Sequence, residues 1–377
     1  MKRRLIMTPG PTEIRDNVKN AFLAPVTNPD LDLDFVEYYS EVCNNLKTIF
    51  NTENDVLILN GEGILGLEAS CASLIEPSDK VLCINNGIFG KGFGDFAKLY
   101  GADVTYYSAD LKRSIDVKEL SDFLDSNPNF KIATLVHCET PSGITNPIDM
   151  LCPLLKSKGI ITVVDSVSAF AGEPLLTDKW QIDIVIAGSQ KCLSASPGLT
   201  ILSISPDAWD AMRNRKNPIA SFYSNLLLWE NWYEKKAFPY TQPESNIHQL
   251  NRAVLNVLEE CDFISRHKNT AEKIRKIFTD CGFELYANSG FSNTVTTILL
   301  PDGVSFINLF ETMKNDFGVL IGGGFDFLEN KIFRIGHMGE NCYDEKIYLT
   351  LKSLDEAFEK LGVPKGKKLH KVYAELD

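Results

Sequence analysis

The stretch IDIVIAGSQK, residues 182–191, is an apolar run that ends in a glycine and is followed three residues later by a lysine. A continuous run rich in β-branched residues is typical of a strand that is buried on both faces of a parallel sheet. Taken alone, Lys191 is expected to extend its ammonium group into solvent. Whether Lys191 instead has a functional role depends on the fold around this run.

Similar runs and helical segments alternate along the preceding part of the chain. The runs are VLILN (56–60), VLCIN (81–85), ADVTYY (102–107), IATLVH (132–137) and IITVVD (160–165). The segments with helical spacing include GLEASCASLIE (66–76), VKELSDFLDS (117–126) and MLCPLLKSKG (150–159). This alternation predicts a doubly wound, mostly parallel α/β sheet, and such sheets bind ligands beyond the carboxyl ends of their strands.

The pattern changes after about residue 262. A helical stretch at 265–280 precedes three apolar segments, NTVTTILLP (293–301), GVLIGGG (318–324) and KIFRIGHMG (331–339). They predict a smaller α+β unit. We therefore expect an N-terminal arm at 1–16 that borders the active site, a large domain at 17–262 and a small domain at 263–377. No Gly/Ser-rich spacer separates the domains, so a cleft between them is the expected site.

Composition narrows the class of protein. The chain has 377 residues, a formal net charge of -12 and a sequence pI near 5.0. This acidic balance argues against a nucleic-acid surface, which needs clustered Lys and Arg. The opening MKRRLIM is too short for a signal peptide or a membrane span. Nine cysteines without closely paired spacing indicate a reducing compartment, hence the cytoplasm, and no metal site.

Three features at predicted strand ends fit one cofactor. Asp165 ends an apolar run, Lys191 follows another, and a glycine-bounded turn at 61–66 opens a helix. Pyridoxal phosphate needs an amine for its aldehyde, a carboxylate for its ring nitrogen and backbone N–H groups for its phosphate. The three features together therefore indicate a pyridoxal-phosphate site.

The motifs themselves resemble a known family. TPGPT (8–12), NNGIFGKGF (85–93), VVDSVSA (163–169), SQKCLSASPG (189–198) and FRIGHMG (333–339) resemble the class V aminotransferases, in particular the alanine/serine:glyoxylate or pyruvate branch of the fold type I pyridoxal-phosphate enzymes. The resemblance spans nearly the whole chain in the same order. It implies ping-pong transfer of an amino group from alanine or serine to glyoxylate or pyruvate, by a homodimer with active sites at the subunit interface.

The resemblance also implies roles around the cofactor ring. Lys191 matches the lysine that binds the cofactor aldehyde and then moves the proton. Asp165 matches the partner of the ring nitrogen, and Phe89 the aromatic residue stacked on the ring. Val167 and Thr140 match further residues around the ring.

The phosphate turn of the family matches NGEGILG (60–66), with the N–H groups of Gly63 and Ile64 at a helix start. Gln190 matches a further phosphate-site residue, and Thr241 one that reaches the phosphate of the partner subunit. Relatives often carry Ser or Thr where this chain has Glu62, and a carboxylate aimed at a phosphate dianion would be repelled.

On the substrate side, Arg334 matches the residue that holds the substrate carboxylate, for which a guanidinium offers a planar pair of donors. Gly10 and Asn28 are expected to border the same pocket. His137, at a strand end, is expected to be hydrogen-bonded structure and not a catalytic base.

Three other functions remain open at this stage. One is a 2-aminoethylphosphonate:pyruvate aminotransferase, and another is a cysteine desulfurase-like lyase, for which Cys192 would have to be a mobile nucleophile. The third is a non-catalytic nucleotide-binding module that uses the turn at 61–66 and has no need of Lys191.

Overall fold

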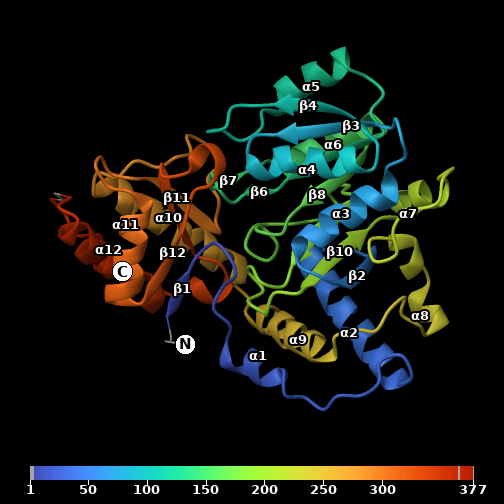
Figure 1. The fold of residues 1–377 in the computed structure, drawn as a ribbon, viewed down its shortest axis with the longest axis horizontal. Helices are drawn as coiled ribbons and strands as arrows, with labels where there is room; N and C mark the ends of the chain where they lie inside the picture. Colours follow the sequence, from blue (N-terminus) through green and yellow to red (C-terminus); the bar gives the residue numbers. More distant parts are fainter. Residues whose placement is uncertain (1–3, 364–365, 377) are drawn as a thin grey trace.

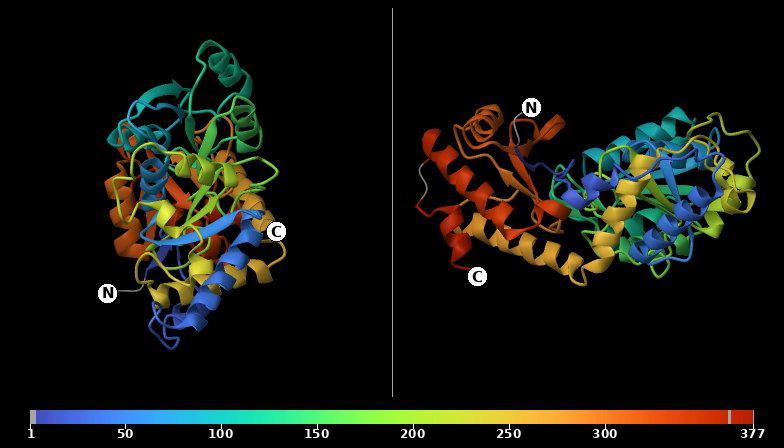
Figure 2. Two further views of the ribbon diagram at one scale, coloured as in Figure 1. Left: turned by 90° about the vertical axis from the view of Figure 1, so that its right-hand side faces the viewer. Right: turned by 90° about the horizontal axis from the view of Figure 1, so that it is seen from below.

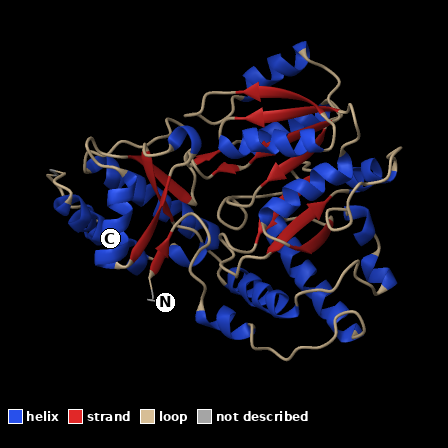
Figure 3. Ribbon diagram, viewed as in Figure 1, coloured by secondary structure: helices blue, strands red, loops and turns tan. Residues whose placement is uncertain are grey.

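The computed structural model describes residues 4–363 and 366–376 and is built around a seven-stranded sheet (Figures 1 and 3). Its strands, in spatial order, are β2 (Asp55–Asn60), β10 (Leu199–Ile204), β9 (Ile184–Gly188), β8 (Ile161–Asp165), β5 (Ile132–Val136), β3 (Lys80–Asn85) and β4 (Asp103–Ser108). From β9 to β4 all neighbours are parallel, whereas β10 is antiparallel to both of its neighbours. The predicted mostly parallel α/β sheet is confirmed.

All six predicted apolar runs form strands of this sheet. The strand that the sequence analysis missed is β10, whose apolar run LTILSI follows the lysine loop directly. Strand β10 inserts between β2 and β9, so β2 closes the sheet at one edge.

Helices cover both faces of the sheet, as the buried parallel strands require. Helices α3 (Gly63–Leu74) and α4 (Ile88–Leu99) pack on each other. Helix α3 also packs against β9 and β10, α4 packs against β3 and β5, and α6 (Ile148–Ser157) packs on β8. The helices of this part of the chain are α1 (Asp16–Ala21), α2 (Leu33–Phe50), α3 (Gly63–Leu74), α4 (Ile88–Leu99), α5 (Val117–Ser126), α6 (Ile148–Ser157), α7 (Pro206–Arg213), α8 (Trp232–Lys235) and α9 (Glu244–Glu259). Side-chain caps fix several starts, such as Asp116 accepting from the Glu119 amide at α5.

The C-terminal segments form a second unit around a four-stranded sheet, which Figure 2 shows at one end of the molecule in orange and red. Its strands, in spatial order, are β1 (Leu5–Met7), β12 (Val319–Gly323), β13 (Ile332–Gly336) and β11 (Val295–Leu299). Its helices are α10 (Phe263–Asp280), α11 (Phe306–Thr312), α12 (Asp344–Lys360) and α13 (Leu369–Ala374). The predicted α+β character is confirmed, whereas β1 was not predicted as its edge strand.

Two apolar cores match the two sheets. The larger cluster packs on the seven-stranded sheet, and a second combines Met7 with apolar residues between 274 and 373. The N-terminal segment therefore belongs to the second core through β1, which pairs in parallel with β12. Residues 1–3 of the expected arm lie outside the described residues, and the domain boundaries at 16 and 262 remain predictions.

Along residues 4–363 and 366–376, none of the helices combines the length and the apolar character that crossing a bilayer requires.

Candidate active site

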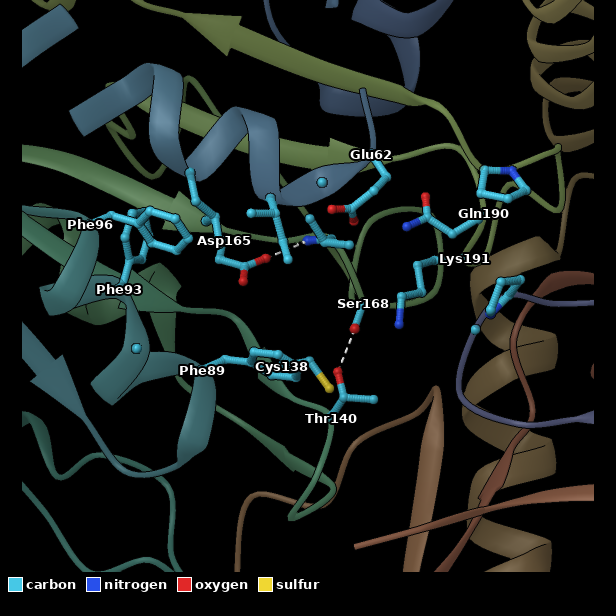
Figure 4. Close-up of a pocket in the computed structure, with 18 residues that line it drawn as sticks. Glu62, Phe89, Phe93, Phe96, Cys138, Thr140, Asp165, Ser168, Gln190 and Lys191 are labelled. Atoms are coloured by element: carbon cyan, nitrogen blue, oxygen red, sulfur yellow. Dashed lines mark hydrogen bonds between the residues drawn. The ribbon is translucent and has the colours of Figure 1, made fainter. Parts of the chain in front are cut away.

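A cavity of about 380 Å³ opens at the carboxyl edge of the seven-stranded sheet (Figure 4). It forms there because β8 and β9 are parallel neighbours and the chain leaves both at the same edge, Asp165 at the end of β8 and Lys191 just after β9. Nine predicted site residues line it: Gly10, Gly63, Ile64, Phe89, Thr140, Asp165, Val167, Gln190 and Lys191. The sheet edge thus gathers most of the predicted site into one cavity.

Lys191 extends along the cavity wall. Its Nζ donates a hydrogen bond of 2.6 Å to the carbonyl oxygen of Pro9. Burial lowers the pKa of Lys191, and the positive charge of Arg334 lowers it further, whereas Asp165 opposes the shift. The amine is therefore closer to its neutral, nucleophilic form at neutral pH than an exposed lysine.

Asp165 is 8% exposed, and its Oδ1 accepts a 2.9 Å bond from the Val167 amide. Within the described chain this is the one hydrogen bond to its carboxylate side chain. Burial raises the pKa of Asp165 to about 6, and the nearby negative charge of Glu62 acts in the same direction. A cationic group in the cavity would therefore be stabilised by this carboxylate.

Two glycines make room for the cavity. Gly10 has a φ of +87°, and a Cβ there would lie 2.5 Å from Cδ of Lys191. A Cβ on Gly63 would lie 2.7 Å from Cγ2 of Val167. Any side chain at Gly10 would therefore displace the lysine, and one at Gly63 would press on the cavity wall.

The first turn of α3 forms the opposite end of the cavity. Glu62 is its N-terminal flanking residue and makes no side-chain cap, so the amides of Gly63 and Ile64 stay available at the helix start. Gln190 is 6% exposed and lines the cavity, and its amide oxygen has no hydrogen-bond partner among the described residues.

Aromatic residues of α4 form another wall. Phe89 is joined there by Phe93 and Phe96, which the sequence analysis did not identify. The helix start is fixed by Glu139, a buried carboxylate in the short strand β6 (Cys138–Glu139), which accepts from the amides of Phe89 and Gly90. Strand β6 pairs with β7 (Ile144–Thr145). Burial raises the pKa of Glu139 to about 7.

Hydroxyl and thiol groups line the wall below Lys191 in Figure 4. The Thr140 hydroxyl is hydrogen-bonded to that of Ser168 at 2.5 Å, and Cys138 lies beside them in the cavity wall. Burial raises the pKa of Cys138 to about 12, so it remains a thiol at neutral pH. His137 is buried, and its Nδ1 is hydrogen-bonded to Ser166, as expected for a structural histidine.

Arg334 does not line the cavity but lies beside it. It is 9% exposed, its Nε donates to the Gly323 carbonyl, and no carboxylate pairs with it among the described residues. Its guanidinium lies 5.6 Å from the ring centre of Phe325, and that ring lies 6.0 Å from the ring of Phe89. Burial lowers the pKa of Arg334 to about 10. Phe325 thus connects Arg334 to the cavity wall.

Asn28 and Thr241 lie outside the cavity of this single chain. The Asn28 side chain accepts from the Asp30 amide in its own turn. The exposed Thr241 donates its hydroxyl to Asp30 and does not cap α9. Their predicted roles remain predictions.

The missed residues Phe93 and Phe96 had a signal in the sequence. They follow Phe89 by four and seven residues, which places all three on one face of a helix. Cys138, Ser168 and Phe325 had none, because side-chain direction at a strand end or in a loop does not follow from spacing.

Metal ligation has no support in the described part of the chain, where no group of His, Cys, Asp and Glu residues could hold an ion.

Known proteins share both the sequence and the fold. The sequence profile described as "Aminotransferase class-V" matches residues 20–220. A pyridoxamine–pyruvate transaminase of Mesorhizobium japonicum is 35% identical over 89% of this chain and 88% of that protein. An alanine–glyoxylate aminotransferase of Drosophila melanogaster is 29% identical over 96% and 94%. The crystal structure of a ureidoglycine–glyoxylate aminotransferase from Bacillus subtilis superposes with a TM-score of 0.96 at 27% identity, over 100% of this chain and 98% of that one.

Proposed function

The chain belongs to the class-V aminotransferases, which are pyridoxal-phosphate-dependent transaminases, and from that premise we propose that it moves an amino group from a small amino acid to a small 2-oxo acid. The observation that carries this proposal is that Lys191 and Asp165 line the same cavity. An amine and a carboxylate at neighbouring strand ends suit opposite sides of one flat heterocycle.

The residues present fit the ring of the cofactor. Asp165 offers a buried carboxylate with a free acceptor capacity for a protonated ring nitrogen, and the aromatic side chain of Phe89 offers a stacking surface. Val167 and Thr140 would border the ring, while Gln190 and the amides of Gly63 and Ile64 would face its 5′ substituent. When bound, the group supplies an electron sink for the bond that breaks at the substrate α-carbon.

Lys191 would bind the cofactor aldehyde and, once released, hold and move the proton between the α-carbon and the cofactor. Its lowered pKa favours the neutral amine that this work needs. The carbonyl oxygen of Pro9 accepts a hydrogen bond from Nζ, which orients the amine within the cavity.

Arg334 would bind the carboxylate shared by the amino donor and the oxo acid. A buried guanidinium without a protein carboxylate has unused donors, and its neighbour Phe325 lies against Phe89 of the cavity. Gly10 would let the substrate approach Lys191, because it leaves space where any Cβ would clash.

The names of the relatives indicate which small substrates to expect. Their names give glyoxylate or pyruvate as acceptors, and alanine as one donor. We extend these small 2-oxo acids, and alanine or serine as donor, to this chain. No observation in the site favours the 2-aminoethylphosphonate reaction. A cysteine desulfurase is disfavoured because burial holds the pKa of the Cys192 thiol well above its usual range.

The assembly we propose is a cytoplasmic homodimer. Large apolar side chains between residues 22 and 33 are exposed in the single chain, namely Phe22, Leu23, Val26, Leu31 and Leu33. Such a cluster is typical of a surface that another subunit covers. Asn28 lies in the same segment, and the exposed Thr241 would then reach the site of the partner. All nine cysteines are free thiols, which supports a reducing compartment.

Mixing the purified protein, loaded with pyridoxal phosphate or with unphosphorylated pyridoxal, with alanine, serine or glycine tests the function. We expect the visible absorption of the cofactor to fall with the productive donor and to return with glyoxylate or pyruvate. A spectrum that responds to none of these donors would contradict the proposal. Light scattering in solution gives the subunit number.

A further inference from the structure

Glu62 stands where a phosphate-binding turn would place a neutral residue. It precedes the first turn of α3, a helix of 12 residues, and it lines the cavity. Figure 4 shows its carboxylate directed into the cavity, on the side of Asp165 and Gln190. The electrostatic effect of Glu62 on the pKa of Asp165 agrees with this direction.

Within the described part of one chain, the Glu62 carboxylate has no cationic partner. No lysine, arginine or histidine forms an ion pair with it among the described residues, and its carboxylate makes no hydrogen bond with them. Lys191 is the cationic residue among those that line the cavity, and its amine donates to the carbonyl oxygen of Pro9. A phosphate monoester, with a charge of about -1.5 to -2 at pH 7, would therefore meet an uncompensated negative charge.

A hydroxymethyl group in the same place would be attracted to the Glu62 carboxylate and not repelled by it. Its hydroxyl is neutral and donates to a carboxylate in a short, charge-assisted bond. It also accepts one bond, which the free amides of Gly63 and Ile64 offer at the helix start. The Glu62 carboxylate meanwhile supplies the negative charge that the N-terminal end of α3 favours.

Gln190 gives an independent indication of a polar ligand at this end. Its side chain is 6% exposed, lies beside Glu62 in the cavity, and keeps an unpartnered amide oxygen. A carboxamide both donates and accepts, which suits a hydroxyl group, whereas a phosphate dianion only accepts.

We propose that this cavity takes the unphosphorylated vitamers pyridoxamine and pyridoxal as exchangeable reactants, with Glu62 accepting a hydrogen bond from their 5′-hydroxyl group. The inference rests on the proposed transaminase function and specifies which form of the ring the site selects.

The reaction balances without a further reagent. Pyridoxamine gives up its amino group and two electrons and becomes the aldehyde pyridoxal. The 2-oxo acid receives both and becomes the amino acid. One water is taken up at the exocyclic carbon next to the ring, which becomes the aldehyde carbon, as its C–N bond breaks, and one is released as the new C–N bond forms on the oxo acid.

Equilibrium dialysis with the two amine forms tests the selection without any turnover. Pyridoxamine and pyridoxamine 5′-phosphate cannot bond covalently to Lys191, so their affinities report the 5′ end directly. We expect the wild-type chain to prefer pyridoxamine. Glu62→Gln and Glu62→Thr should shift the affinity ratio toward the phosphate by about tenfold or more, because they remove a like charge.

Glu53→Gln is the matched control, since Glu53 is an exposed carboxylate outside the cavity and its loss changes the net charge equally. It should leave the ratio unchanged. A wild-type preference for the 5′-phosphate that both Glu62 variants leave unaltered would overturn the inference while the transaminase function stands. Failure of both pyridoxamine and pyridoxamine 5′-phosphate to bind would overturn the inference and the transaminase function together.

A second readout uses the products. With pyridoxamine and pyruvate as the only reactants and no added phosphate ester, the wild-type chain should release free pyridoxal and alanine in equal amounts over many turnovers. Release limited to a single turnover would contradict the proposed exchange.

Discussion

The two ends of the cavity differ in how firmly they are held. At the strand ends, Asp165 is buried and bonded to Val167, and Lys191 is bonded to Pro9. At the start of α3, Glu62 and Ile64 are exposed, and the Glu62 carboxylate makes no hydrogen bond in the described chain. The firmly held end carries groups suited to chemistry, and the open end carries groups suited to selection. Changes at the first end should alter rates, and changes at the second should alter which reactant binds.

The largest effect on rate is expected from a change at Lys191, in the firmly held end. Lys191→Ala should lower the rate of the half-reaction with alanine by about 10²–10⁴-fold or more, because it removes the group that moves the proton. Single-turnover spectroscopy measures this rate. Lys179→Ala, which removes an exposed lysine outside the cavity, is the control. A Lys191→Ala rate within tenfold of wild type would mean that another group performs the step.

Arg334 tests whether the second unit contributes to substrate binding. Arg334→Ala should weaken binding of carboxylate donors by about 2–5 kcal/mol, the range for truncating a buried charged partner. The KM for alanine should rise, and Arg334→Lys should restore only part of the loss because an ammonium lacks the planar pair of donors. An unchanged KM in both variants would place the substrate carboxylate elsewhere.

Asp165, at the firmly held end, should also affect how the free energy of unfolding depends on pH. Its folded-state pKa is about 6, above the ordinary value of 3.8, because of burial. The native state therefore binds the extra proton between these values, and the free energy of unfolding falls as pH rises from about 4 to 6, by up to about 3 kcal/mol.

Asp165→Asn keeps an acceptor for Val167 and removes this dependence. At pH 7 the ligand-free variant should be more stable than wild type while its transamination rate falls. Denaturant titrations at pH 4 and pH 7 measure the effect. A free energy of unfolding that falls equally over this pH range in both proteins would show that other groups cause it.

The smallest expected effect is at Phe89, in the wall between the two ends. Phe89→Leu should weaken binding of the vitamer ring by about 0.5–1.5 kcal/mol, the value of an aromatic stacking contact beyond its area. Fluorescence titration with pyridoxamine measures this change. Equal affinities for wild type and variant would show that Phe89 only closes the wall.

Much of the firmly held end could be predicted from the sequence. Asp165 and Lys191 directly follow apolar runs, and parallel strands bring such positions to one edge. Phe93 and Phe96 were equally readable from their helical spacing with Phe89 but were missed. Strand β10 was missed because its run follows the lysine loop without a break.

Other parts of the site leave no local pattern. Strand β1 has 3 residues, too few for a periodic signal, although it brings the chain to Pro9 and Gly10. Phe325 lies beside Phe89 only because the two sheets meet near the cavity. The positions of Asn28 and Thr241 relative to a neighbouring subunit depend on an assembly that spacing does not encode.

The hydrogen bond between Lys191 and Pro9 connects the amine to the second sheet. Two residues before it, Met7 pairs with Ile321 in the second sheet, so the carbonyl that receives the amine moves with that sheet. A shift of the C-terminal unit that stretches this contact would free the amine and change its basicity at the same moment. Strand β1 therefore links the second sheet to the amine of Lys191 through this one hydrogen bond.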